Sequence, residues 1–145
     1  LEQYTIHAGR SIPNIWSIGG FSLSENTAYA CEPFVTTEQG GGFVRNGKIK
    51  NIFAINSRKK TKNEEADKLL NFIWENFNML PFALRWITKE WEEKKARELL
   101  DILIKKKAVQ AYPVLIEVNE QRVAQAEHTF IPTESGVTVT TKALA

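Results

Sequence analysis

At 145 residues and 43% hydrophobic content, the chain carries enough apolar material for the core of one compact domain, which excludes an intrinsically disordered protein. Its 19 Lys and Arg and 17 Asp and Glu leave a net charge of +2, too small for the concentrated positive field of a dedicated nucleic-acid-binding protein, so the charge argues against a nucleic-acid partner. A single cysteine, Cys31, excludes an internal disulfide and a cysteine-rich zinc site, and the lack of a signal peptide or of an apolar run of roughly 18 residues predicts a cytoplasmic protein without membrane contact.

The first predicted strand is "AYACEPFVT", residues 28–36. Its alternation places Glu32 on one face with Ala30 and Phe34. Pro33 has no N–H group for a strand ladder, so it predicts a bulge or a sheet edge at this point.

A glycine run at 40–42 predicts a turn after this strand. Two short strands are expected next, at 43–45 and 49–55. The Asn46-Gly47 pair between them is typical of a tight hairpin.

The hydrophobic period then changes to that of helices. Thr61 and Glu64 form a capping-box pattern, and the helix that follows is expected to end near Asn78, before Pro81. A second helix is expected over residues 88–107. The predicted apolar faces are Ala66, Leu69, Leu70, Ile73 and Phe77 for the first helix, and Ala96, Leu99, Leu100 and Leu103 for the second.

Strand periodicity returns after Tyr112, over 114–118, 122–131 and 137–141. The order of strands, two helices and strands predicts an α+β fold in which a helical hairpin is inserted between the halves of one antiparallel sheet. The expected divisions are strands over 1–57, the helical insertion over 58–111, returning strands over 112–141 and a tail over 142–145.

Two glutamates occupy strand faces that also carry small or apolar residues, namely Glu32 and Glu127. A single strand glutamate most often faces water on the wet side of an antiparallel sheet. Two that converge from different strands need a cation or a hydrogen-bond donor, which suggests a divalent metal site or an acid/base pair. A salt bridge to an arginine remains the alternative, with candidates Arg45, Arg85 and Arg122.

The chain has two histidines, His7 and His128. His128 alternates to the strand face opposite Glu127, so we interpret it as a hydrogen-bonded core or edge residue. His7 lies in "HAGRSIPN", where Gly9 and Pro13 fix an irregular backbone, and loops of this kind often carry function.

Five segments together resemble, in order and spacing, the C-terminal half of type II methionine aminopeptidases of the archaeal and eukaryotic kind. They are "YTIHAGRSIPN", "CEPFVTTEQG", "LPFALRW", "YPVLIEV" and "VAQAEHTFI". The resemblance implies the pita-bread fold, in which two related α+β halves enclose a dinuclear metal site. It implies removal of the initiator methionine from nascent peptides.

The resemblance also assigns roles to individual residues. Glu32 in "CEPF" and Glu127 in "AEHT" match the two glutamate metal ligands of the family, and Glu32 is expected to handle the proton of the attacking water. His7 matches the histidine that contacts the scissile amide or the developing oxyanion. The positions that match the methionine side-chain pocket are Ile6, Tyr112 and Leu115.

The family's other ligands, two aspartates and a histidine, have no counterpart in this chain. We therefore expect the missing N-terminal half of the enzyme as a partner, two divalent ions (Co, Mn, Fe, Zn or Ni) whose shell it completes, and no activity from the 145-residue chain alone. A non-catalytic homologue that acts as a binding or scaffold module is the alternative. A nucleic-acid-binding module built on the helical insertion is a third possibility that the mixed charge disfavours.

Overall fold

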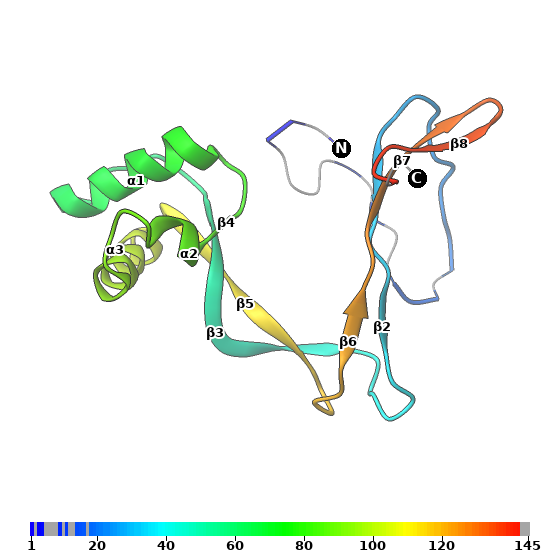
Figure 1. Ribbon diagram of the computed structural model, residues 1–145, viewed down its shortest axis with the longest axis horizontal. Helices are drawn as coiled ribbons and strands as arrows, with labels where there is room; N and C mark the ends of the chain where they lie inside the picture. Colours follow the sequence, from blue (N-terminus) through cyan, green and yellow to red (C-terminus); the bar gives the residue numbers. More distant parts are fainter. Residues whose placement is uncertain (2, 5–8, 10, 12–13, 17, 143–145) are drawn as a thin grey trace. The chain divides into compact units, whose positions relative to one another are not determined.

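The computed structural model describes residues 1, 3–4, 9, 11, 14–16 and 18–142. The chain divides into two compact units, which are unit 1 (Leu1–Val44 and Glu117–Ala145) and unit 2 (Arg45–Ile116). In the described residues, regular structure in unit 1 consists of strands, whereas unit 2 contains the helices (Figure 1).

Unit 2 consists of three helices and a three-stranded sheet in the order β4-β3-β5. Its elements are β3 (Val44–Ile55), α1 (Glu64–Phe77), β4 (Phe82–Ala83), α2 (Leu84–Ile87), α3 (Glu93–Lys105) and β5 (Val109–Glu117). The strands that precede and follow the helical segment pair with each other, as expected of an insertion between strands. The longest described helix, α1, has 14 residues, fewer than a bilayer span needs, and the described helices include no candidate for crossing a membrane.

The N-cap of helix α1 lies two residues after the predicted cap, Thr61. Asn63 is the N-cap residue, and its side chain accepts a hydrogen bond from the Ala66 N–H at 2.9 Å. Thr61 is not the cap, because its hydroxyl donates instead to Asp67 Oδ1 at 2.9 Å. The helix ends at Phe77, and Asn78 follows with a φ of 55°, close to the predicted end.

The predicted helix over 88–107 is wrong at its start. Residues 84–87 form the separate short helix α2, and α3 begins only at Glu93, where the Glu92 side chain accepts from the Lys94 N–H at 3.3 Å. The predicted apolar stripe of this helix is confirmed, since Ala96, Leu99, Leu100 and Leu103 are all buried.

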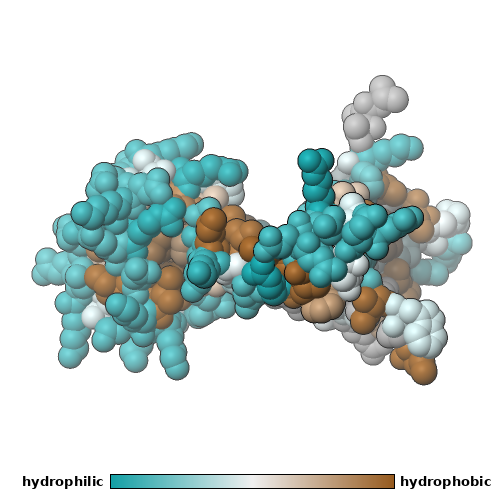
Figure 2. All heavy atoms as spheres, turned by 90° about the horizontal axis from the view of Figure 1, so that it is seen from below, coloured by the Kyte–Doolittle hydropathy of each residue, from teal (hydrophilic) through white to brown (hydrophobic). Residues whose placement is uncertain are grey.

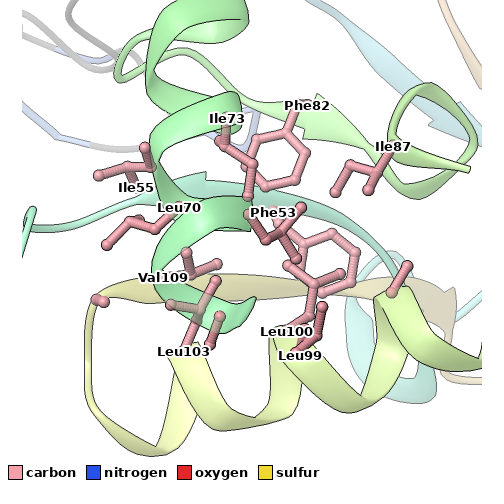
Figure 3. Close-up of a cluster of buried hydrophobic side chains, with 14 of the residues drawn as sticks. Phe53, Ile55, Leu70, Ile73, Phe82, Ile87, Leu99, Leu100, Leu103 and Val109 are labelled. Atoms are coloured by element: carbon pink, nitrogen blue, oxygen red, sulfur yellow. The ribbon is translucent and has the colours of Figure 1, made fainter. Parts of the chain in front are cut away.

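The hydrophobic core lies within unit 2 (Figure 3), where side chains of α1, α3, β3 and β4 point toward one another. Phe82 stacks on Phe53 with ring centroids 5.8 Å apart and on Phe77 at 5.5 Å. Each fully buried Leu, Ile or Phe contributes about 1.5–3 kcal/mol relative to exposure. Unit 2 therefore contains a buried apolar core that stabilises its fold.

The predicted hairpin at Asn46-Gly47 is wrong, because β3 runs without interruption through both residues. A Cβ at Gly47 would lie 2.8 Å from the Val114 carbonyl oxygen and 2.9 Å from the Ile116 side chain. Glycine is needed here because β5 passes so close, and no turn is required.

The strands of unit 1 form two separate sheets, whereas one continuous antiparallel sheet was predicted. Its strands are β1 (Tyr29–Cys31), β2 (Phe34–Thr36), β6 (Val123–Gln125), β7 (His128–Thr133) and β8 (Gly136–Val139). They form a sheet in the order β1-β7-β8 and a two-stranded ladder β2-β6, all antiparallel. Among the described residues, every buried hydrophobic side chain lies between Phe53 and Val109, so the described part of unit 1 has no apolar core of its own.

Candidate functional site

The two glutamates singled out from the sequence lie opposite each other in unit 1. The β1-β7 ladder pairs Cys31 with His128, and the β2-β6 ladder pairs Phe34 with Gln125. Two residues separate the strands on each side, so the register is the same in both ladders. Glu32 is therefore opposite Glu127.

Pro33 explains why the ladder is interrupted at this point. It lacks an N–H group, and it lies opposite Ala126, whose own N–H donates to the Pro33 carbonyl oxygen at 3.3 Å. Because hydrogen-bonded and non-hydrogen-bonded pairs alternate, the neighbouring Glu32 and Glu127 fall at a non-hydrogen-bonded position, where facing side chains approach more closely. In the described sheets β1 and β2 are edge strands, and the predicted edge at Pro33 is confirmed.

Polar contacts orient Glu32 but not Glu127. Gln125 Nε2 donates to Glu32 Oε2 at 3.3 Å, which is the diagonal contact expected of residues on one face of an antiparallel pair. Within the described part of the chain, no ion pair of Glu127 is recorded, so the arginine alternative is not supported for this residue.

Asn14, the last residue of the "HAGRSIPN" segment, pairs with the free edge of β2. Its Nδ2 donates to the Phe34 carbonyl oxygen at 2.6 Å, and its Oδ1 accepts from the Phe34 N–H at 3.4 Å. An asparagine side chain carries both a donor and an acceptor, so it can replace a neighbouring strand. This contact, two residues from Glu32, was not predicted from the sequence.

The other predicted site residues fall into three groups. His7 and Ile6 lie outside the described residues. Tyr112 and Leu115 lie on β5 in unit 2, where strand alternation assigns them to opposite faces, and Leu115 is exposed. His128 is hydrogen-bonded as expected, through Nδ1 to Thr141 Oγ1 at 3.0 Å, but it is exposed and so is not a core residue.

Glu117 is a buried carboxylate that the sequence analysis missed. It is 3% exposed, and its oxygens accept hydrogen bonds from the backbone N–H groups of Gly41 at 2.5 Å, Asn119 at 2.8 Å and Gln121 at 3.2 Å. Burial alone would raise the pKa of Glu117, but the backbone donors of Gln121, Asn119, Gly41 and Gly42 outweigh burial and hold the pKa below its ordinary value.

The described residues supply only part of a metal site. They contain no group of three or more His, Cys, Asp or Glu side chains that could hold an ion. Two opposed carboxylates nevertheless suit a divalent cation, because a cation bound between them offsets the repulsion of their negative charges. The two carboxylates could therefore supply part of the ligand shell of a metal ion, but not all of it.

Comparison with known proteins finds relatives that match nearly the whole chain. The chain is 37% identical over 142 residues to a methionine aminopeptidase of Methanocaldococcus jannaschii, which covers 98% of this chain and 47% of the relative. The chain is homologous to half of a methionine aminopeptidase. The enzyme of Saccharolobus solfataricus is 37% identical over 147 residues, 99% of this chain and 48% of the relative, and that of Archaeoglobus fulgidus is 36% identical over 143 residues.

The chain thus spans about half the length of the curated methionine aminopeptidases it matches. These relatives are aminopeptidases by name, and aminopeptidases are hydrolases. No protein-family model matches the chain.

A solved structure supports the fold. The structure of a thermophilic Arx1, a pita-bread protein, matches 77% of this chain and 29% of its own length with a TM-score of 0.66 and 18% identity. The expected α+β fold, part of a pita-bread architecture, is confirmed.

Proposed function

We propose that the chain is part of a methionyl aminopeptidase, which removes the initiator methionine from the N-terminus of nascent proteins. One observation supports this most strongly. Glu32 and Glu127, the residues expected as metal ligands, are opposite each other in a chain that is 37% identical to methionine aminopeptidases. Two carboxylates in this arrangement favour a cation between them.

The proposed centre holds two divalent ions, with Glu32 and Glu127 as two of its ligands. When bound, such ions polarise the peptide carbonyl and lower the pKa of water. Carboxylate ligands do not distinguish among the candidate metals, which are Co, Mn, Fe, Zn and Ni. The remaining ligands, expected to be two aspartates and a histidine, would come from the other half of the enzyme.

Glu32 is proposed to take up and release the proton of the attacking water. Its carboxylate is oriented for this by the hydrogen bond from Gln125 Nε2 at 3.3 Å. His7 is proposed to donate a hydrogen bond to the oxygen on which negative charge develops. Tyr112 and Leu115 alternate to opposite faces of β5, so one of the two, and separately Ile6, is proposed to contact the methionine side chain. An apolar pocket for this side chain discriminates by only about 1–3 kcal/mol per methylene.

The other half of the enzyme is the proposed partner of unit 1. Unit 1 exposes apolar side chains at its surface, and hydrophobic residues are visible in its part of Figure 2. They include Phe34, Val35, Phe43, Val44, Val123 and Val137. Covering this surface would contribute about 25 cal/mol per Å² of apolar area buried. The described part of unit 1 has no buried apolar core that would supply this stabilisation itself.

A non-catalytic scaffold is the less favoured alternative. The curated relatives are methionine aminopeptidases by name. In a scaffold with no bound cation, the repulsion between two opposed carboxylates would destabilise the strand pair, and no metal binding would offset it.

The test compares the chain alone with the chain joined to the missing half of the enzyme. Release of methionine from a Met-Ala peptide with added divalent metal is measured for both. The joined protein is expected to be active, the chain alone inactive, and the joined Glu127→Gln variant strongly impaired. Turnover by the 145-residue chain alone, or full activity of the variant, would contradict the proposal.

A further inference from the structure

The β2-β6 ladder that borders the glutamate pair has little to fix its register. Each strand has three residues, and five of the six are exposed, Thr36 being half-buried. Register is strongly specified where one strand face is buried, and it is prone to slip where neither face is. Other contacts must therefore hold this ladder in place.

Glu117 supplies such contacts directly beyond the last ladder pair, Thr36 with Val123. Its carboxylate joins two turns, because one oxygen accepts from Gly41 in the turn after β2 and the other accepts from Asn119 and Gln121 in the turn before β6.

Side-chain bonds join the same two turns. Thr36 Oγ1 donates to the Arg122 carbonyl oxygen at 2.9 Å, and Thr37 Oγ1 donates to Gln121 Oε1 at 3.1 Å. Asn119 Nδ2 donates to the Gln39 carbonyl oxygen at 3.0 Å.

The two turns can approach each other this closely in only one register of β2 against β6. A Cβ at Gly41 would lie 2.4 Å from Val118 Cγ2, so a side chain at this position would displace Val118 or move the two turns apart, whereas glycine allows the close approach. A slip of two residues would move the turns by roughly 6.6 Å at 3.3 Å per residue. The buried carboxylate would then lose its donors, and a buried charge without donors is strongly unfavourable.

We propose that Glu117 is a positioning residue, which fixes the register of β2 against β6 and thereby holds Gln125 beside the Glu32 carboxylate. The functional meaning of this role rests on the proposed aminopeptidase site, but the register itself does not.

The register can be measured without metal or substrate, by disulfide formation in the 145-residue chain with Cys31→Ser and excess oxidised glutathione as the oxidant. Val35→Cys with Ala124→Cys forms a directly opposed pair of the β2-β6 ladder, and Val35→Cys with Ala126→Cys forms a diagonal pair that needs a slip of two residues. The opposed pair is expected to cross-link and the diagonal pair to cross-link far more slowly, because a disulfide requires Cα atoms within about 7 Å.

Adding Glu117→Ala should slow cross-linking of the opposed pair by roughly tenfold or more and speed that of the diagonal pair, because the freed backbone N–H groups no longer favour one alignment. Glu117→Gln, which keeps the shape but has one acceptor oxygen, should give an intermediate rate. Glu134→Ala, which removes an exposed carboxylate in the turn between β7 and β8, is the matched control and should leave both rates unchanged.

A separate reporter distinguishes slippage from unfolding. In the chain with native Cys31, His128→Cys creates the opposed pair of the β1-β7 ladder, which Glu117 does not contact. Its cross-linking should persist in Glu117→Ala. The proposal is overturned if this reporter fails together with the Val35 and Ala124 pair, since Glu117 would then support only the fold, or if Glu117→Ala changes none of the rates. Neither result would bear on the metal ligands, which the peptide assay tests.

Discussion

Glu32 and Glu127 lie opposite each other across a two-residue interruption that two antiparallel ladders share. The equal spacing on both sides preserves the register, and Pro33 causes the interruption because it has no N–H to donate. This arrangement brings two carboxylates from distant parts of the chain to one position on one face. In a metal aminopeptidase, such a pair would hold part of the metal shell.

Removing one charge of the pair should stabilise the metal-free chain. Like charges directly opposite in a sheet are destabilising, and a cross-strand pair is worth about 0.2–1 kcal/mol, so Glu127→Gln should raise the free energy of unfolding by an amount in this range. Urea unfolding at pH 7 and low salt measures the change. Glu134→Gln removes an exposed carboxylate elsewhere in unit 1 and should show no gain. Equal effects of the two variants would argue against repulsion within the pair.

Glu117 should make the turns of unit 1 sensitive to acid. Its pKa in the folded chain lies below the ordinary value of about 4.5. The stabilisation is therefore fully present above that pH and is lost as the pH falls through the lower folded pKa. The amide proton shifts of Gly41 and Asn119, followed by NMR during an acid titration, should report a midpoint below 4.5. A midpoint at or above that value would show that the backbone donors do not outweigh burial.

Gly47 should tolerate no side chain. In Gly47→Ala, the new Cβ would lie 2.8 Å from the Val114 carbonyl oxygen, and overpacking of this kind costs about 1–3 kcal/mol. The melting temperature of the variant should fall accordingly. Gly20→Ala is the control, because a Cβ there meets nothing within 4 Å, and it should leave the melting temperature unchanged. A neutral Gly47→Ala would indicate that residues 46–47 form a turn after all.

Asn63 should be the residue that caps α1. Asn63→Ala removes the acceptor of the Ala66 N–H and should cost about 0.5–2 kcal/mol of stability. Thermal unfolding followed by helical circular dichroism measures the loss. Replacement by Asp, which retains the acceptor, should restore most of it, and failure of this rescue would assign the cap elsewhere.

The helix faces could be predicted from the sequence because they depend on a local period. Residues spaced three and four apart share a helix face whatever the rest of the chain does, and the predicted faces of α1 and α3 are buried except for Phe77, which is half-buried. The start of α1 could not be predicted as well. Thr61 and Asn63 are both good capping residues, and the choice between them depends on the contact of Thr61 with Asp67.

The errors in the strands come from contacts between residues distant in sequence. Asn46-Gly47 is typical of a hairpin, yet Gly47 is needed for the approach of β5, some 70 residues later. In the sequence, Glu117 is typical of a strand glutamate that faces solvent, and its burial depends on the contact with the distant turn at Gly41. Strand alternation and the resemblance to methionine aminopeptidases predicted that Glu32 and Glu127 share a site, but the register that aligns them is set by pairing over more than 90 residues.

The most direct test of this account is a nuclear Overhauser measurement between the Hα protons of Glu32 and Glu127 in the 145-residue chain. Residues at a non-hydrogen-bonded antiparallel position have the closest approach of their Cα atoms, so a strong cross-peak between these two protons is predicted. A cross-peak from Glu32 Hα to a residue two positions from Glu127, with none to Glu127 itself, would contradict the pairing and with it the proposed metal-binding pair.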